Sequence, residues 1–320
     1  MDQGGVDKDR RDFLAKAGAG LLLTQAAVAQ TAEPVWKTVF PASFRNERIK
    51  TSGAEMNTVI GGSGPPVLLF HGAPQCLLMW HTIAADLAKD FTLVMCDLRG
   101  YGESSKPADQ PHYAQQSKSA MALDGVEVMK SLGYREFFMV GHDRGARVGR
   151  RMALDHPDKV RKLLVMDIVP AHYLYSHVTI EFVQAYFHWF NNLRPAPGPE
   201  NDQVKQNEAA LARATDPVQR QYLKYMTDFA TVHAMCEDYR AAASIDLAQD
   251  NADQKAGKKI QCPVHAIWAA NGPMGKLYDV LGIWREEGVV VTGKGLPGNH
   301  FLTESAPRET LAEVQGFLKA

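Results

Sequence analysis

The chain carries almost no net charge. Its 35 Lys and Arg residues and 36 Asp and Glu residues leave a formal charge of −1 at pH 7 over 320 residues. A balanced chain has no overall positive field that would collect polyanions, so nucleic acid is not an expected partner. Binding of an anion would have to come from a local group of cationic side chains.

Cysteine is scarce as well. The four cysteines lie far apart in the sequence and form no C-x-x-C pair: Cys76, Cys96, Cys236 and Cys262. This spacing argues against a metal site, and we expect free thiols rather than disulfides. The sequence therefore predicts no metal and no cofactor.

Apolar runs long enough to cross a bilayer are also missing, since no stretch reaches the ~20 residues that a membrane helix needs. At the N-terminus, the arginine pair of RRDFLAK (10–16) precedes the small apolar residues of 17–29, which end in an A-x-A cleavage pattern. The segment 1–29 resembles a twin-arginine export signal, although Asp9 before the arginines departs from the usual pattern. We expect periplasmic export, cleavage near Gln30 and a soluble mature protein without membrane contact. A disordered leader on a cytoplasmic protein is the alternative.

Short apolar runs rich in β-branched residues alternate with helical patterns along most of the chain. Six runs are expected to form strands, at residues 67–70, 92–96, 137–140, 162–166, 264–268 and 289–291. A helical pattern covers 121–132, and a second helix from about 145 to 155 ends before Pro157. This alternation predicts an α/β fold with a doubly wound, mostly parallel sheet.

The alternation stops between residues 171 and 259. This stretch is rich in aromatic residues, includes the loop RPAPGPE and holds no convincing strand. We therefore expect a helical cap at 171–259, inserted between two parts of one core at 30–170 and 260–320.

Residues 141–147 read GHDRGAR and follow the expected strand at 137–140. Small residues two places before and two places after a central residue are typical of a nucleophile elbow, a tight strand-to-helix turn that usually presents serine. Here the central residue is Asp143. An ionised carboxylate needs no base and can displace a leaving group from saturated carbon, giving an enzyme ester. The competing interpretation is an aspartate that only caps the following helix.

Hydrolysis of such an ester requires a histidine to activate water and an acid to orient that histidine. Asp167 follows the expected strand at 162–166, and His300 lies in the turn GLPGNHF after the last strand. We predict that these two residues complete a triad with Asp143. The competing interpretation of Asp167 is an aspartate at a strand end that only binds backbone. The backbone NH groups of Ala73 and Arg144 are the expected donors to the oxyanion of the ester intermediate.

Two arginines, Arg144 and Arg147, lie in the first turn of the helix after Asp143, where the helix dipole disfavours cations. Their guanidinium groups match a carboxylate in bidentate fashion. This pattern favours a small anionic substrate whose carboxylate neighbours the carbon that is attacked. The alternative is that both arginines pair with protein acids, as we expect for Arg150 and Arg151.

Together, GGSGPPVLLFHGAPQ, CDLRGYGESSKP, GHDRGARVGRRMALDHPDKV, MDIVP, FHWF, EDYRAA and LPGNHF resemble the fluoroacetate (haloacetate) dehalogenases of the α/β-hydrolase fold, from about Val59 to Leu318. The resemblance implies that Asp143 is the nucleophile and that Arg144 and Arg147 hold the substrate carboxylate. It also implies that His188, Trp189 and Tyr239 of the cap hold the departing halide. Without it, FHWF would be interpreted as an amphipathic core stretch. The family usually has phenylalanine at the position of Ala73, so a wider pocket for larger 2-haloacids is one implication.

Two other functions stay open at this point. An epoxide hydrolase also uses an elbow aspartate, with cap tyrosines such as Tyr173, Tyr175, Tyr186 or Tyr239 protonating the epoxide, but it usually has tryptophan after the nucleophile. A non-catalytic exported receptor for small carboxylates would be expected to lack a member of the triad. Beyond a small anionic substrate, the partner considered is a second copy of the chain in a homodimer.

Overall fold

The computed structural model describes residues 33–320. The predicted export signal at 1–29 lies outside these residues. Residues 35–320 form one compact unit. Within the described residues, no helix has the length and apolar character needed to cross a membrane.

The core is a sheet of eight strands in the order β1-β2-β4-β3-β5-β6-β7-β8. β2 is antiparallel to both of its neighbours, and every other neighbouring pair is parallel. The strands are β1 Arg45–Lys50, β2 Glu55–Gly62, β3 Pro66–Phe70, β4 Thr92–Cys96, β5 Phe137–His142, β6 Val160–Met166, β7 Val264–Ala269 and β8 Val291–Leu296. The predicted doubly wound, mostly parallel α/β sheet is therefore confirmed.

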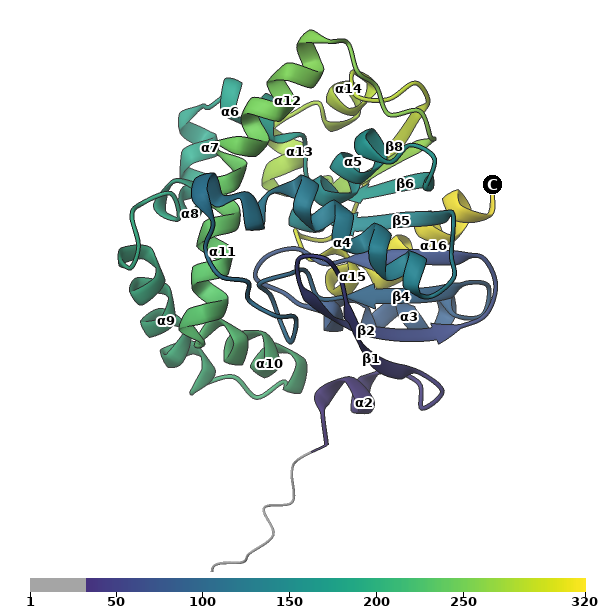
Figure 1. The fold of residues 1–320 in the computed structure, drawn as a ribbon, viewed down its shortest axis with the longest axis horizontal. Helices are drawn as coiled ribbons and strands as arrows, with labels where there is room; N and C mark the ends of the chain where they lie inside the picture. Colours follow the sequence, from purple (N-terminus) through teal and green to yellow (C-terminus); the bar gives the residue numbers. More distant parts are fainter. Residues whose placement is uncertain (1–32) are drawn as a thin grey trace, which may run out of the picture. The chain divides into compact units, whose positions relative to one another are not determined.

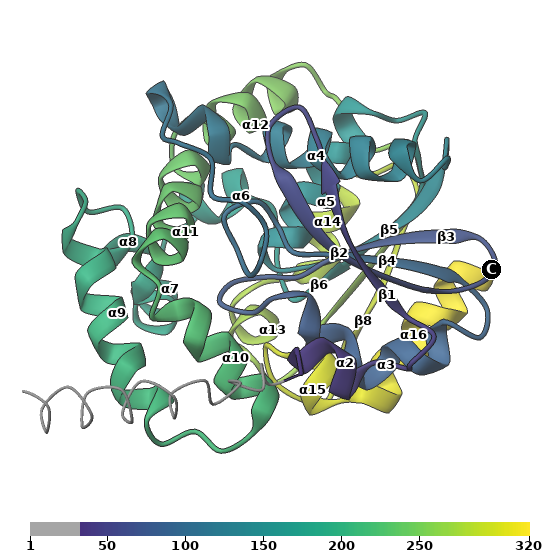
Figure 2. The ribbon, with the colours of Figure 1, turned by 60° about the horizontal axis from the view of Figure 1, so that its bottom comes forward.

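Helices cover both faces of the sheet (Figures 1 and 2). Alternate side chains of β3 enter two separate cores: Leu68 and Phe70 pack in one, Val67 and Leu69 in the other. The first core includes residues of α4 (Lys118–Ser131), α5 (Arg144–Asp155) and α14 (Val280–Arg285). The second includes residues of η1 (Leu77–Trp80), α3 (His81–Leu87), α15 (Leu302–Ser305) and α16 (Pro307–Lys319). Burial on both faces explains the continuous apolar runs of the central strands.

The stretch between β6 and β7 is helical, as the sequence predicted, and lies beside the core in Figure 1. It comprises α6 Ala171–Ser176, α7 Ile180–Ala185, α8 Phe187–Asn191, α9 Gly198–Leu211, α10 Pro217–Met226, α11 Phe229–Ala242 and α12 Ile245–Lys255. The remaining elements are α2 Val35–Val39, η2 Pro111–Gln116 and α13 Pro273–Leu277.

The structure corrects one predicted strand boundary and adds two strands. The last strand is β8, Val291–Leu296, and not 289–291, because Val289 and Val290 are exposed residues before it. β1 and β2 were not predicted at all. β1, RNERIK, is an edge strand with Ile49 as its single buried residue, so its composition resembles a surface loop.

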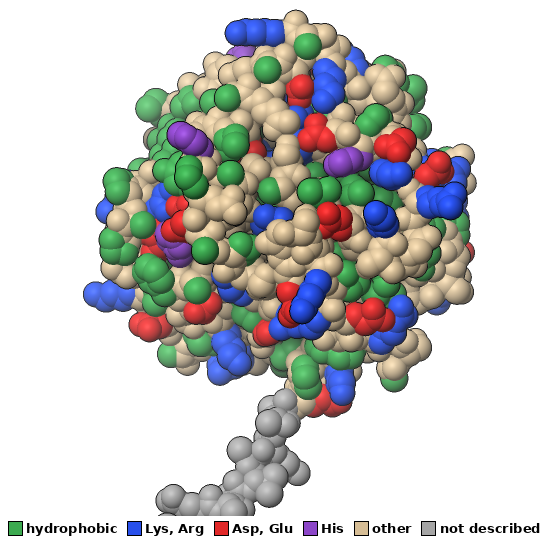
Figure 3. Space-filling view, viewed as in Figure 1, with side chains coloured by type: hydrophobic (Ala, Val, Ile, Leu, Met, Phe, Trp, Pro, Cys, Tyr) green, Lys and Arg blue, Asp and Glu red, His purple; other side chains and the backbone are tan. Residues whose placement is uncertain are grey.

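The surface and the cysteines agree with the composition. On the face seen in Figure 3, positive and negative side chains are interspersed, so neither sign dominates it. The four cysteines are free thiols in the structure.

Candidate active site

The sharp turn after β5 presents Asp143 with φ 44° and ψ −110°, a strained conformation for a residue with a side chain. Small neighbours make this turn possible. A Cβ atom on Gly145 would lie 2.5 Å from the carbonyl oxygens of Phe70 and His71, and one on Gly141 would lie 2.6 Å from the backbone nitrogen of Ala146. The G-x-D-x-G frame is therefore required by packing of the turn against β3 and α5.

Asp143 is 4% exposed, and its Oδ2 lies 3.3 Å from the backbone nitrogen of Ala73, which donates to it. Burial on its own would raise the pKa of this carboxyl group. The nearby His300, His142, Arg144 and Arg147 outweigh burial, and the pKa is lowered. The side chain is therefore ionised at neutral pH, the state that a carboxylate nucleophile needs.

His300 and Asp167 lie together as the sequence predicted. The distance from His300 Nδ1 to Asp167 Oδ2 is 2.6 Å, and the other oxygen of Asp167 accepts a hydrogen bond of 2.9 Å from the backbone NH of Ala269. Burial lowers the pKa of His300, but the hydrogen bond to Asp167 and the charges of Asp143 and Asp167 raise it overall. With Nδ1–H donated to the carboxylate, Nε2 is left to exchange a proton with water.

Sequence reasoning did not single out His142, the residue before Asp143. Its Nε2 lies 2.9 Å from the backbone carbonyl oxygen of His300, and the two imidazole rings are 4.6 Å apart. Burial, together with the charge of His300, lowers the pKa of His142 to about 4. A neutral His142 thus donates to the loop that carries His300 and fixes its position. The sequence feature that could have indicated a role for His142 is its position inside the motif GHDRGAR.

The two arginines of the motif differ in their surroundings. Arg144 is fully buried, and its Nε and Nη2 donate to the two carboxylate oxygens of Asp238 at 2.9 and 2.6 Å, while Nη1 has no partner. Arg147 donates one hydrogen bond, of 3.2 Å, to the carbonyl of Val169, and its Nε and Nη1 have no partner among residues 33–320. Burial and the charge of Arg144 lower the pKa of Arg147 to about 10.

The two arginines predicted to hold the substrate carboxylate therefore differ in the charge that faces them. Arg144 already has a protein carboxylate as partner, whereas Arg147 pairs with none among the described residues. Arg150 and Arg151 do pair with protein acids, as predicted, through Asp250 and Asp253 respectively.

Asp238 on α11 is a site residue that the sequence reasoning missed, although it lies in the EDYRAA stretch. Besides Arg144, it accepts hydrogen bonds from Lys118 and from the hydroxyl of Tyr101, the latter at 2.8 Å. Burial would raise the pKa of this carboxyl group, but the charges of Arg144 and Lys118 lower it far below its usual range. Asp238 thus links the cap to the core through Arg144, the residue after Asp143.

The three predicted halide residues lie around the same arginines. Trp189 and Tyr239 are each 2% exposed, and their rings are 5.9 Å apart. The guanidinium carbon of Arg147 lies 4.4 Å from the Trp189 ring, and that of Arg144 lies 4.2 Å from the Tyr239 ring. His188 is more exposed than either, and its ring is 5.9 Å from that of Tyr239. Burial lowers its pKa, so His188 is neutral at pH 7.

Comparison with known proteins places this site in a family. The family model for the alpha/beta hydrolase fold matches residues 65–300. The chain belongs to the α/β-hydrolase fold family. It is 40% identical over 287 residues to a fluoroacetate dehalogenase from Burkholderia sp, covering 86% of this chain and 94% of that protein.

Two solved structures share the fold and much of the sequence. A candidate α/β hydrolase from Nostoc sp PCC 7120 is 46% identical, with a TM-score of 0.82 over 87% of this chain and 98% of that one. A candidate epoxide hydrolase from Pseudomonas aeruginosa is 37% identical, with a TM-score of 0.80 over 88% and 97%. The α/β hydrolase described here is thus related to both fluoroacetate dehalogenases and epoxide hydrolases, which confirms the resemblance seen in the sequence.

Proposed function

We propose that this enzyme hydrolyses the carbon–halogen bond of small 2-haloacids such as fluoroacetate or chloroacetate. The observation that carries the proposal is the buried guanidinium of Arg147, which has no carboxylate partner and shares one site with the ionised Asp143. A buried cation without a counter-charge is costly, and an anionic substrate would supply that charge. The identity to the Burkholderia protein supports the same substrate class.

In the first step, a carboxylate oxygen of Asp143 attacks the carbon that bears the halogen. The new C–O bond forms as the carbon–halogen bond breaks, and the halide leaves with the bonding electron pair. Arg147, assisted by the unpartnered Nη1 of Arg144, holds the substrate carboxylate. Trp189, Tyr239 and His188 donate hydrogen bonds to the departing halide, because each carries an NH or OH group.

In the second step, Nε2 of His300 takes a proton from water, and the resulting hydroxide attacks the carbonyl carbon of the Asp143 ester. The backbone NH groups of Ala73 and Arg144 stabilise the oxyanion that forms. When this intermediate collapses, the bond from the carbonyl carbon to the substrate oxygen breaks, and that oxygen takes the proton from His300 to give the 2-hydroxyacid. Asp143, now carrying the added hydroxyl oxygen, loses its proton to solvent and is a carboxylate again. Asp167 orients His300 and stabilises its cationic form.

Epoxide hydrolysis is the second candidate, and one observation favours it. The hydroxyl groups of the cap residues Tyr175 and Tyr186 are buried and have no hydrogen-bond partner in the described part of the chain, so they are available to protonate an epoxide oxygen. An epoxide is uncharged, however, and leaves Arg147 without a counter-charge.

The deciding experiment measures halide release from fluoroacetate, chloroacetate and bromoacetate beside diol formation from styrene oxide. We expect stoichiometric halide and glycolate from the haloacetates and slow or no turnover of styrene oxide. Efficient opening of styrene oxide without halide release would establish the second candidate instead.

A further inference from the structure

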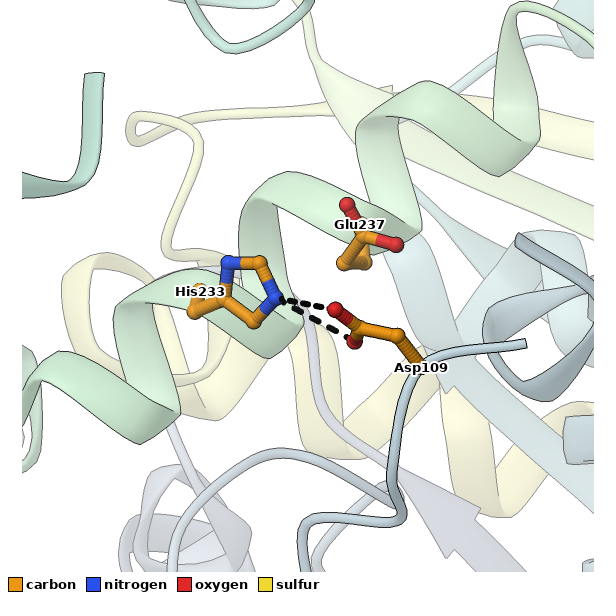
Figure 4. Close-up of side chains that lie close together, drawn as sticks. All are labelled: Asp109, His233 and Glu237. Atoms are coloured by element: carbon orange, nitrogen blue, oxygen red, sulfur yellow. Dashed lines mark hydrogen bonds and ion pairs between the residues drawn. The ribbon is translucent and has the colours of Figure 1, made fainter. Parts of the chain in front are cut away.

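Helix α11 carries a second group of polar residues besides Asp238 and Tyr239. His233 and Glu237 are four residues apart and therefore lie on one face of α11. Asp109, from the loop before η2, meets them there (Figure 4). One ligand atom from each of the three residues lies within 4.8 Å of the other two, and His233 Nε2 is 3.0 Å from Asp109 Oδ2.

The imidazole of His233 is oriented by a fourth residue. Its Nδ1 lies 3.2 Å from Oε1 of Glu200, a carboxylate of α9 that is fully buried. A proton on Nδ1 is donated to Glu200, so Nε2 points toward Asp109. This is the arrangement by which carboxylates orient metal-binding histidines in proteins.

The charges around His233 do not balance. Among the described residues, Arg240 is the one Lys or Arg that pairs with the carboxylates of this group, lying 2.9 Å from Glu200 and 2.8 Å from Glu237. Three carboxylates thus face one guanidinium and the imidazole of His233, whose pKa, despite burial, the hydrogen bonds to Asp109 and Glu200 raise, so one negative charge remains even when His233 is protonated. A bound divalent cation would compensate the remaining negative charge.

We propose that Asp109, His233 and Glu237 bind a divalent transition-metal ion of the Zn²⁺ class. Ligands of a tetrahedral zinc ion lie about 3.3 Å apart, so His233 and Asp109 are already at the required separation. Glu237, which accepts hydrogen bonds from Arg240 at 2.8 Å and from Gln115 at 3.4 Å, supplies the third ligand oxygen by moving toward the other two. The ion displaces the proton of Nε2, and water fills the fourth position, because the Asp109 side chain is 59% exposed.

A metal ion at this site would stabilise the structure of the cap and would take no part in the chemical step. Asp109 precedes the residues of η2, which pack against α11, so a shared ion would fasten this loop to the helix that presents Asp238 and Tyr239. Metal binding is therefore expected to stabilise the protein against unfolding, since only the folded chain brings these ligands together.

Titration of the purified full chain with Co²⁺, followed by displacement with Zn²⁺, tests the proposal without reference to enzyme activity. We expect one equivalent of Co²⁺ to give a visible absorption band that Zn²⁺ removes, and Zn²⁺ to raise the unfolding temperature. In His233→Ala and in Asp109→Asn, the Zn²⁺ affinity should fall roughly ten-fold or more. The control His177→Ala, which changes an exposed histidine elsewhere in the cap, should bind as the wild type does.

Asp109→Asn keeps the test decisive if His233→Ala is poorly folded, because Asp109 is exposed and its replacement preserves the size of the side chain. A Co²⁺ spectrum identical to that of the aqueous ion would overturn the proposal. So would stoichiometric binding that both variants retain. Dehalogenation can fail or succeed independently of either result.

Discussion

Arg147→Met is expected to weaken the binding of haloacetates strongly while leaving the fold at least as stable as before. Arg147 is buried, makes one hydrogen bond to a backbone carbonyl and faces Trp189. Methionine fills a similar volume with an unbranched apolar chain. The substitution therefore removes the charge without opening a large cavity.

The expected change in the free energy of unfolding follows from the pKa of Arg147. Lowering the pKa of Arg147 from 12.5 to about 10 means that the site disfavours the charged form by about 3 kcal/mol. Methionine avoids this cost but loses the hydrogen bond and the contact of the cation with Trp189, together about 1–3 kcal/mol. The free energy of unfolding should stay unchanged or rise slightly.

The expected change in KM follows from the loss of the ion pair between Arg147 and the substrate carboxylate. A hydrogen bond to a charged partner contributes about 1.5–3 kcal/mol, so KM for chloroacetate should rise roughly ten- to hundred-fold. Binding is measured independently by the protection that the product glycolate gives against thermal unfolding. That protection should be clear in the wild type and largely absent in Arg147→Met.

Arg144→Met provides the contrast. The substitution removes the bidentate partner of Asp238, so that only Lys118 and Tyr101 remain to balance the buried carboxylate. We expect a loss of about 3 kcal/mol in the free energy of unfolding, at the low end for a broken buried pair. If Arg147→Met destabilises the protein as much as Arg144→Met, or if glycolate still protects it, the reasoning about the unpaired guanidinium is refuted.

Four further outcomes are expected. His300→Asn should release one equivalent of halide without turnover and gain the mass of one carboxymethyl group on Asp143; halide release from an unmodified protein would contradict the covalent mechanism. Because the hydrogen bond to Asp167 raises the pKa of His300 above its usual 6.5, the enzyme should lose activity as pH falls through that raised value, and Asp167→Asn should move the loss to lower pH. Tyr239→Phe should slow fluoride release more than bromide release, since fluoride is the poorer leaving group. Mass spectrometry of protein from its native host should show a start near Gln30, whereas a full-length cytoplasmic product would contradict export.

The residues of the proposed triad could be picked out from the sequence because each is marked by a local pattern. Asp143 lies in a turn where Gly141 and Gly145 leave no room for a side chain. The backbone of the turn itself crowds Gly141, and the backbone at the end of β3 crowds Gly145. Asp167 and His300 each follow a strand end, and the carboxyl ends of parallel strands meet at one edge of the sheet. Local sequence and topology together were sufficient to bring these three side chains into one site.

The partners of the charged cap residues were not predictable in the same way. Asp238 lies 94 residues from Arg144, and His233 lies 124 residues from Asp109. These contacts depend on how the cap packs on the core, which no periodicity in the sequence specifies. Each residue alone also has an ordinary explanation as a polar side chain of an amphipathic helix.

The different surroundings of Arg144 and Arg147 follow from their spacing on α5. Three residues apart, they project in adjoining but distinct directions, so only Arg144 meets Asp238 of α11, whereas Arg147 meets Trp189 of α8. Both neighbours belong to the cap. The core contributes Asp143, Asp167 and His300, so the hydrolytic step depends on the core. The proposed site for the substrate carboxylate includes Arg144 and Arg147 in the surroundings that α8 and α11 give them when packed against α5. Loosening the cap should therefore impair the binding of haloacetates before it impairs the hydrolysis of an ester already formed on Asp143.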